Sequence, residues 1–373
     1  MSNRRILIFS LAYYPLVGGA EIAVKEITNR IPEIEWDMVT LSFDKAHKKI
    51  EKVGNVNIYR ISSSKTLFPM KAFFFTRVLA DRQNYNAIWA IMANRAGLAA
   101  LLYKMALPTT PYILTLQEGD SLEYIKHKTR LIGPLFKMIF TRADKIQAIS
   151  NFLASWARQM GYQKEIELIP NGVDLNKFTI NNKQFTRNTE NITLITTSRL
   201  VEKNGVGDII DAIKLLPENI CLQIIGSGPL EENLKFKIKN LKLENRVEML
   251  GEIPNSDISL FLNKADIFVR PSLSEGQGIS FIEAMAAGLP IIATPVGGIP
   301  DFLKDPSTSS GQVATGLFCE VNNPKSIADK VMEYINNQDL TRKIVDNARK
   351  MVEEKYDWDL IAKEMKGRVF DKV

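Results

Sequence analysis

The chain has few of the residues that bind metals or form disulfides. Its 373 residues include two cysteines, Cys221 and Cys319, and two histidines, His47 and His127. The cysteines are far apart in apolar, strand-like surroundings, which indicates reduced thiols in a cytoplasmic compartment. Both histidines are expected at the surface. The sequence therefore offers no evident metal site.

Long apolar runs are also missing. No segment reaches the ~18 apolar residues that a membrane-spanning helix needs. The chain enters the apolar run Ile6–Leu11 almost at once, and this run is too short for the hydrophobic region of a signal peptide. The hydrophobic share of 45% and the charged share of 24% are ordinary for a globular protein. We therefore expect a soluble, cytoplasmic protein.

Acidic residues are scarce in the first half of the chain. Residues 1–172 hold 23 Lys and Arg against 14 Asp and Glu, a net charge of +9, whereas the remaining residues hold 25 against 28, a net charge of −3. This asymmetry suggests that only the first half meets an anionic partner. The alternative is an ordinary solvated surface. Nucleic-acid binding would rest on this charge alone, because no recognised module accompanies it.

Strand-like and helix-like segments alternate along the whole chain, which predicts parallel sheets with helices on both faces. The expected strands are Arg5–Leu11, Asp37–Ser42, Val56–Ile61, Ala87–Ile91, Tyr112–Leu116, Lys145–Ile149, Ile166–Ile169, Ile192–Thr197, Ile220–Ile225, Val247–Leu250, Ile267–Arg270 and Pro290–Ala293. The expected helices are Ala20–Ile31, Lys71–Asp81, Ala96–Met105, Leu131–Thr141, Phe152–Met160, Gly207–Leu216, Leu230–Leu241, Ile258–Lys264, Ile279–Ala287 and Ser326–Asn336. Two such arrays imply two doubly wound domains with a cleft between the ends of their sheets.

The domain boundaries follow from composition. We expect a first domain over residues 1–172 and a second over residues 173–355, with the Asn-rich stretch Asn181–Asn191 as the linker region. Residues 356–373 form an amphipathic pattern with an aromatic start, and this pattern predicts a C-terminal helix that packs back on the first domain.

The segment from Pro271 to Pro290 is the most informative about function. Gly276 and Gly278 follow the strand that ends at Arg270 and precede a helix, so backbone N–H groups and the positive helix end can meet an anion there. Glu283 lies in an otherwise apolar stretch of that helix. A buried, unpaired carboxylate costs several kcal/mol, so Glu283 needs a protein partner or a ligand hydroxyl.

Together the motifs resemble the retaining glycosyltransferases of family 4, which have the α/β GT-B fold of two Rossmann-like domains. The matching segments are residues 13–21 (Tyr-Tyr-Pro-Leu-Val-Gly-Gly-Ala-Glu), 148–152, 169–174, 198–205 (Ser-Arg-Leu-Val-Glu-Lys-Asn-Gly), 225–230, the stretch around Glu275 and Glu283, and 296–301 (Val-Gly-Gly-Ile-Pro-Asp). Each motif alone is weak, but their order and spacing along the whole chain are specific.

The resemblance implies a role for each matching residue in binding a nucleotide-sugar donor. Arg199 and Lys203 would bind the diphosphate, Glu275 the transferred sugar near the reacting carbon, and Glu283 the ribose hydroxyls. The remaining donor contacts would come from Gly276, Gln277, Gly278, Ile279, Ser280, from Gly18 and Gly19 of the first domain, and from Ile253 near the nucleobase. The simpler alternatives are a surface arginine at 199 and an ordinary tight turn at the two glycines.

The implied activity is transfer of a sugar from a UDP- or GDP-sugar to a glycan or lipid-linked acceptor with retention of configuration. The resemblance also implies a hexosyltransferase-type enzyme of polysaccharide or glycolipid biosynthesis that needs no cofactor and no metal. A donor phosphate oxygen would accept the acceptor proton, so Glu275 is not assigned as a glycosidase-like base. A dehydrogenase is poorly supported, because no Gly-x-Gly-x-x-Gly follows the first strand.

Three positions depart from the family pattern. Gln117-Glu118-Gly119-Asp120 stands where the family often has a histidine near the sugar, Asn204 occupies the usual place of the diphosphate lysine, and Gln277 replaces a frequent aromatic residue. These departures leave open a weakly active or inactive nucleotide-sugar-binding relative. A nucleotide-sugar epimerase of the same fold is a further alternative, although it would be expected to show a histidine-rich cleft.

Basic and aromatic residues interleave in two first-domain segments, Lys71–Arg77 and Tyr124–Phe140. Such segments can lie on an anionic bilayer and face a lipid-linked acceptor, which would give a peripheral association at the inner face of the membrane. Alternatively, the apolar side chains pack in the core and the lysines are solvated.

Overall fold

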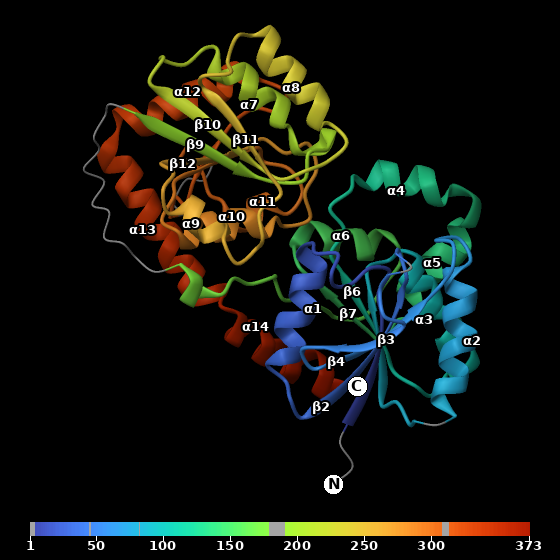
Figure 1. Ribbon diagram of the computed structural model, residues 1–373. Helices are drawn as coiled ribbons and strands as arrows, with labels where there is room; N and C mark the ends of the chain where they lie inside the picture. Colours follow the sequence, from blue (N-terminus) through green and yellow to red (C-terminus); the bar gives the residue numbers. More distant parts are fainter. Residues whose placement is uncertain (1–3, 45, 82, 179–190, 308–312) are drawn as a thin grey trace. The chain divides into compact units, whose positions relative to one another are not determined.

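The computed structural model describes residues 4–44, 46–81, 83–178, 191–307 and 313–373. The expected linker Asn181–Asn191 lies, except for Asn191, outside these described residues. The chain divides into two units (Figure 1): unit 1 comprises Met1–Asn171 and Trp358–Val373, and unit 2 comprises Gly172–Asp357. Each unit is described by itself.

Unit 1 is built on an eight-stranded sheet in the order β3-β4-β2-β1-β5-β6-β7-β8. Its strands are β1 (Arg4–Phe9), β2 (Ile34–Leu41), β3 (Ile50–Val53), β4 (Val56–Ile61), β5 (Ala87–Ile91), β6 (Tyr112–Leu116), β7 (Lys145–Ala148) and β8 (Ile166–Leu168). All neighbouring pairs are parallel except β3 and β4, which are antiparallel.

Helices cover both faces of this sheet because successive side chains of a strand point to opposite faces. Leu7 and Phe9 of β1 belong to a core that α2, α3, α5 and α6 share, whereas Ile6 and Ile8 belong to a core that α1 and α14 share. The helices are α1 (Gly19–Asn29), α2 (Phe68–Ala80), α3 (Arg95–Ala106), α4 (Leu122–Thr129), α5 (Gly133–Thr141), α6 (Asn151–Gln159) and α14 (Trp358–Glu364), with a 3₁₀ turn, η1, at Arg130–Ile132.

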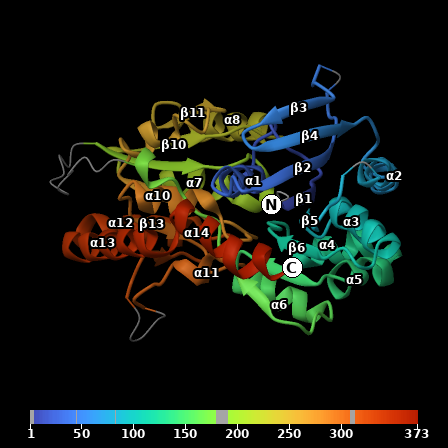
Figure 2. The ribbon, with the colours of Figure 1, turned by 90° about the horizontal axis from the view of Figure 1, so that it is seen from below.

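The C-terminal residues pack on unit 1. After α14 the chain continues through a π-helical turn, η4 (Met365–Val369), and a 3₁₀ turn, η5 (Phe370–Lys372). The Phe370 ring lies 5.1 Å from the Trp36 ring and 5.0 Å from the Trp89 ring, centroid to centroid. The end of the chain, drawn in red in Figure 2, therefore completes the core on the α1 face of the sheet.

Unit 2 has a six-stranded parallel sheet in the order β11-β10-β9-β12-β13-β14. Its strands are β9 (Ile192–Thr197), β10 (Ile220–Ile225), β11 (Val247–Gly251), β12 (Ile267–Arg270), β13 (Ile291–Ala293) and β14 (Leu317–Phe318). Its helices are α7 (Val206–Ile213), α8 (Glu231–Asn240), α9 (Ile258–Leu262), α10 (Ile279–Ala286), α11 (Ile299–Phe302), α12 (Pro324–Asn336) and α13 (Gln338–Lys355), with 3₁₀ turns η2 (Leu175–Lys177) and η3 (Glu202–Asn204).

Each sheet reverses its strand order beside its first strand. In unit 1 the reversal lies between β1 and β5, and in unit 2 it lies between β9 and β12. In doubly wound sheets, ligands bind at the carboxyl ends of the strands at such a switch point. The two parallel-sheet, Rossmann-like domains confirm the predicted α/β fold class.

Several elements differ from the sequence expectations. The strands β3 and β14 and the helices α4, α11 and α13 were not predicted, and the expected helix Leu131–Thr141 is instead η1 followed by α5. The edge strand β3 and the helix α13 show why. The β3 sequence Ile-Glu-Lys-Val is short, and none of its side chains is fully buried. In α13 charged residues dominate, and only Thr341, Ile344, Ala348 and Val352 are buried. In both elements the apolar signal was too sparse to mark a regular segment.

Candidate functional site

Two loops meet at the switch point of unit 2. The loop after β9 carries Arg199 and Lys203, and the loop after β12 carries Glu275 to Ser280. Because β9 and β12 are parallel neighbours, their carboxyl ends lie side by side. The backbone N–H of Leu273 donates a hydrogen bond of 2.7 Å to the carbonyl oxygen of Lys203, which joins the two loops directly.

Glu275 is buried between these loops, with an exposed fraction of 9%. Its carboxylate forms an ion pair with the guanidinium of Arg270, the last residue of β12. The other carboxylate oxygen accepts a 3.0 Å hydrogen bond from the backbone N–H of Gly276. The backbone carbonyl of Glu275 accepts a 3.1 Å bond from the N–H of Gly298. Both the side chain and the main chain of Glu275 are therefore held in place.

The residues that follow Glu275 lead directly into a helix. Gly276 and Gln277 are buried, and Gly278 is the residue that precedes α10. Ile279 and Ser280 form the first turn of α10 and are partly exposed. The first N–H groups of a helix have no partner within the helix, so this turn offers donors and a positive dipole end to an anion.

Glu283 is partly exposed, and its protein partner is Asn255. The Asn255 side-chain amide donates a 3.4 Å hydrogen bond to a Glu283 carboxylate oxygen. Burial raises the pKa of Glu283, while the bond from Asn255 and the charge of Lys177 act to lower it. Ile253 lies in the same turn as Asn255 and packs, partly buried, against the core around α10. The carboxylate on an apolar helix therefore faces the turn after β11.

Arg199 is exposed beyond the end of β9, and Lys203 lies half-buried in η3. The neighbouring Asn204 is buried, and its side-chain amide donates a 2.6 Å hydrogen bond to the backbone carbonyl of Arg199. The Asn204 side-chain oxygen lies 3.5 Å from Arg270 Nη2. Asn204, at the usual lysine position, therefore stabilises the loop through buried hydrogen bonds, and its side chain does not point into solvent.

Gly18 and Gly19 belong to unit 1, where they begin α1 after β1. Gly18 caps the helix in an extended conformation, and a Cβ atom there would lie 2.8 Å from Glu21 Oε2. Burial raises the pKa of Glu21, while the backbone N–H groups of Glu21 and Gly18 act to lower it. A side chain at position 18 would therefore collide with Glu21, whose carboxylate folds back over the first turn of α1.

The segment that replaces the expected histidine follows β6 in unit 1, with Gln117 and Glu118 buried, Gly119 half-buried and Asp120 exposed. Gln117 accepts a 3.1 Å hydrogen bond from the Asn171 side chain. Glu118 Oε1 accepts a 2.5 Å bond from the backbone N–H of Ala93, whereas Glu118 Oε2 is buried and has no hydrogen-bond partner among the described residues. Burial raises the pKa of Glu118 to about 7.

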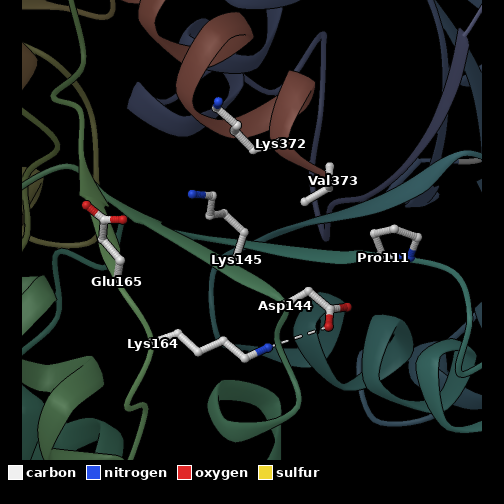
Figure 3. Close-up of a pocket in the computed structure, with 7 residues that line it drawn as sticks. All are labelled: Pro111, Asp144, Lys145, Lys164, Glu165, Lys372 and Val373. Atoms are coloured by element: carbon white, nitrogen blue, oxygen red, sulfur yellow. Dashed lines mark ion pairs between the residues drawn. The ribbon is translucent and has the colours of Figure 1, made fainter.

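A hollow of about 380 Å³ lies elsewhere in unit 1 (Figure 3), and Pro111, Asp144, Lys145, Lys164, Glu165, Lys372 and Val373 line it. Pro111, Asp144 and Glu165 directly precede or begin β6, β7 and β8, so the hollow is at the amino ends of these strands. Two of its three lysines are already paired: Lys145 with Glu167 at 2.6 Å and Lys164 with Asp144 at 3.6 Å. It is on the wrong edge of the sheet for the usual ligand position.

The described residues hold no group of three or more His, Cys, Asp or Glu that could bind a metal ion. The sequence Asp357-Trp358-Asp359 contains two spaced carboxylates, but Asp359 accepts a 2.6 Å hydrogen bond from Arg30 and the Trp358 side chain between them is buried. Among the same residues, no helix is both long and apolar enough to cross a bilayer.

Two residues at the unit 2 site were not singled out from the sequence. Arg270 was predicted only as the end of a strand, and Asn255 was not assigned a role. The available signal was a charged residue that ends an otherwise apolar strand, because a buried guanidinium requires several acceptors.

Two family models match the chain. "Glycosyltransferase Family 4" matches residues 17–177, and "Glycosyl transferases group 1" matches residues 177–351. The sequence is 29% identical over 356 residues to MJ1178, an uncharacterized glycosyltransferase of Methanocaldococcus jannaschii, and this match covers 93% of each chain.

Solved structures of the same fold include a sucrose-phosphate synthase of Thermosynechococcus elongatus, with a TM-score of 0.83, 19% identity and coverage of 99% of this chain and 98% of that chain. Another is Anabaena HepE in complex with UDP-glucose, with a TM-score of 0.79, 20% identity and coverage of 99% of this chain and 100% of that chain. At these identities the likeness establishes the two-domain GT-B architecture and nothing further.

Proposed function

The chain belongs to the family 4 glycosyltransferases, and we propose that it transfers a sugar from a UDP- or GDP-sugar to a glycan or lipid-linked acceptor with retention of anomeric configuration. One observation carries the proposal. The buried, ion-paired Glu275 lies at the switch point between β9 and β12, directly before the first turn of α10. This arrangement supplies an oriented carboxylate for sugar hydroxyls beside N–H donors for phosphate.

Within the proposal, each residue has one task. Glu275 accepts hydrogen bonds from the transferred sugar, and Arg199 and Lys203 offset the charge that develops on the departing diphosphate. The backbone of Gly276 to Ser280 approaches the sugar and phosphates, and Gly18 and Gly19 are also assigned to donor binding. Glu283 accepts from the ribose hydroxyls, and Ile253 contacts the nucleobase. HepE, which has the same fold, was solved with UDP-glucose, and this supports a nucleotide-sugar donor.

The proposed reaction replaces one bond at the anomeric carbon with another. The bond to the β-phosphate oxygen breaks, and the acceptor hydroxyl oxygen bonds to the same face of the sugar. The acceptor proton passes to the departing phosphate oxygen, so that the nucleoside diphosphate leaves with it. This scheme needs no protein base, and the protein contributes orientation and electrostatic stabilisation.

The direct test is donor hydrolysis in the absence of acceptor. We expect slow release of nucleoside diphosphate from a UDP- or GDP-sugar, at least ~100-fold reduced in Glu275→Ala. Glu218→Ala is the matched control, because the Glu218 side chain is 94% exposed and precedes β10 at the opposite edge of the same sheet. With an acceptor present, proton NMR of the product reports whether the anomeric configuration is retained.

An inactive nucleotide-sugar-binding relative is the second candidate, favoured by Asn204 at the lysine position and by the missing histidine. A thermal shift with UDP or GDP, without turnover of any sugar donor or acceptor, would support it. A ligand at 100 times its Kd adds about 2.7 kcal/mol of stability, which such a scan detects. An epimerised nucleotide sugar among the products would instead indicate the epimerase.

We propose in addition that the outer face of α2 contacts an anionic membrane surface. This helix buries Phe68, Ala72, Thr76 and Leu79 and turns a second apolar stripe outward. Phe74 is 60% exposed and Val78 is 57% exposed, and Met70 and Leu67 continue the stripe. One apolar face of this segment therefore packs in the core, and a second apolar face is exposed, which supports the proposal.

A second exposed apolar group lies near η1 and α5, where the Leu131 side chain is 92% exposed and Ile132 and Leu135 are also exposed. Lys126, Lys128 and Arg130 are exposed around it, and Lys71 is exposed on α2. Both α2 and α5 pack on α3, so the two helices lie on the same side of the unit 1 sheet (Figure 1). Apolar side chains ringed by lysines fit an interface with anionic lipid, where each basic residue contributes about 1 kcal/mol.

Vesicle co-sedimentation tests this surface. We expect binding to vesicles with anionic lipid at low salt, weaker binding to neutral vesicles, and loss of binding in Phe74→Ser with Val78→Ser. The control is Phe236→Ser, since Phe236 is 67% exposed but belongs to α8 of unit 2. Absence of binding to anionic vesicles at low salt would overturn the proposal, as would equal binding of the double variant.

A further inference from the structure

Arg270 occupies the centre of the unit 2 site without being one of the family-matched donor residues. It is the last residue of β12 and is buried, with an exposed fraction of 8%. Its guanidinium donates from Nε to Ser272 Oγ at 3.2 Å and from Nη1 to Ser280 Oγ at 2.6 Å. From Nη2 it reaches Asn204 Oδ1 at 3.5 Å and forms the ion pair with Glu275.

These partners come from three separate segments of the site. Ser272 and Glu275 belong to the loop after β12, Ser280 to the first turn of α10, and Asn204 to η3 after β9. The guanidinium also lies over the Phe281 ring, 5.0 Å from its centroid. A planar guanidinium has five N–H donors in a fixed fork, so one side chain can fix several segments at once.

The charge of Arg270 matters as well as its geometry. An unpaired carboxylate at the Glu275 position would be strongly disfavoured, because burial removes its water. Arg270 is the cation that the described structure places beside it. The Glu275 oxygen bonded to Gly276 N–H has a second lone-pair direction, which is where a sugar hydroxyl can donate.

We propose that Arg270 is a positioning residue for sugar transfer: it orients the Glu275 carboxylate toward the donor sugar, and through Asn204 it fixes the loop that carries Arg199. The inference rests on the proposed function, because it assigns the partner of Glu275 within the same donor site. Asn204 completes the link, since its amide holds the Arg199 backbone carbonyl at 2.6 Å. The sugar end and the diphosphate end of the site are thereby coupled through one buried cation.

The test compares two buried arginines of unit 2 in the full-length protein. Arg246 is the matched control, because its side chain is 10% exposed and donates to the carbonyls of Leu216, Pro217 and Ile220 at the amino end of β10. Arg270→Leu and Arg246→Leu both remove a buried guanidinium and both are expected to lower the melting temperature. Arg270→Lys keeps the positive charge but loses the planar set of guanidinium N–H donors. It serves as the folded variant if Arg270→Leu does not fold.

Two measurements separate positioning from support of the fold. In Arg270→Leu we expect donor kcat/KM to fall about 100-fold, mainly in kcat. Arg270→Lys should recover part of kcat, and Arg246→Leu should leave kcat and KM unchanged. Independently of turnover, the losses of urea stability in Arg270→Leu and Glu275→Gln should not add in the double variant, whereas those of Arg246→Leu and Glu275→Gln should add.

The outcomes are distinct. A wild-type protein that turns over no donor contradicts the proposed function, while the double variant still tests the coupling of Arg270 to Glu275. Wild-type kcat/KM in Arg270→Leu overturns the inference. It is equally overturned if the stability losses of Arg270→Leu and Glu275→Gln add, or if Arg270→Lys recovers none of kcat, because the role of Arg270 would then be structural alone.

Discussion

Two buried glutamates follow strands at the carboxyl edges of the two sheets, and their surroundings differ. Glu275 follows β12 in unit 2 and is ion-paired with Arg270. Glu118 follows β6 in unit 1 and is bonded to the backbone N–H of Ala93 at 2.5 Å, with its second oxygen buried and unbonded among the described residues. Both carboxylates are withdrawn from water, but within the described part of the chain only Glu275 has a cation against it.

The position of a glutamate in a Rossmann-like sheet therefore does not determine whether its side chain accepts or donates hydrogen bonds. With Arg270 beside it, Glu275 is suited to accept hydrogen bonds as an anion. Without such a partner, burial raises the pKa of Glu118 to about 7, so a large share of Glu118 carries a proton at neutral pH and can donate a hydrogen bond. The same side chain thus provides an acceptor in one unit and a donor in the other.

Replacing each glutamate by glutamine should give the largest difference in stability between the two sites. Glu275→Gln leaves the buried Arg270 without its counter-charge, and we expect the free energy of unfolding to fall by about 3–5 kcal/mol. Glu118→Gln removes no ion pair and keeps a similar shape, so at neutral pH it should leave stability unchanged or raise it. Urea unfolding of both variants at pH 7 measures the difference. Equal losses would show that the ion pair does not distinguish the two sites.

The backbone around Glu275 offers a second, smaller test. Gly297 has φ of +56°, and a Cβ there would lie 1.8 Å from the Glu275 carbonyl oxygen. Gly288 has φ of +76°, but a Cβ there would meet nothing within 4 Å. The left-handed conformation alone costs an L-residue about 1–2 kcal/mol, and overpacking adds roughly 1–3 kcal/mol.

Gly297→Ala should therefore destabilise unit 2 by about 3 kcal/mol and Gly288→Ala by about 1–2 kcal/mol. Only Gly297→Ala should weaken nucleotide-sugar binding, because it displaces Glu275. Thermal unfolding with and without UDP-glucose measures both effects. Identical behaviour of the two alanine variants would mean that the Glu275 main chain adapts without loss.

The sequence predicted the strands and the helix around the site better than the side-chain contacts inside it. The apolar runs of β9 and β12 and the Gly-rich start of α10 are local patterns, and the structure confirms these elements. The contacts of Arg270 with Asn204 and Ser280 join residues 66 and 10 positions away, and such contacts depend on how the strands pair. That no described residue places a cation beside Glu118 is likewise a tertiary property, which the sequence Leu-Gln-Glu-Gly-Asp does not reveal.

The pH dependence of stability gives the most specific test. The folded-state pKa of Glu118 is raised to about 7 from an ordinary value near 4.5, so the folded protein holds this proton more tightly than the unfolded chain. The associated stability is fully present below about pH 4.5 and is lost as the pH rises toward and through 7. Glu118→Gln cannot ionise and escapes this loss. Between pH 5 and pH 8 the variant should therefore gain roughly 2–3 kcal/mol relative to the parent, at about 1.4 kcal/mol per pKa unit. Urea unfolding of both proteins across this range measures the gain. If the two plots of unfolding free energy against pH are parallel, Glu118 has a counter-charge, and it does not differ from Glu275 in this respect.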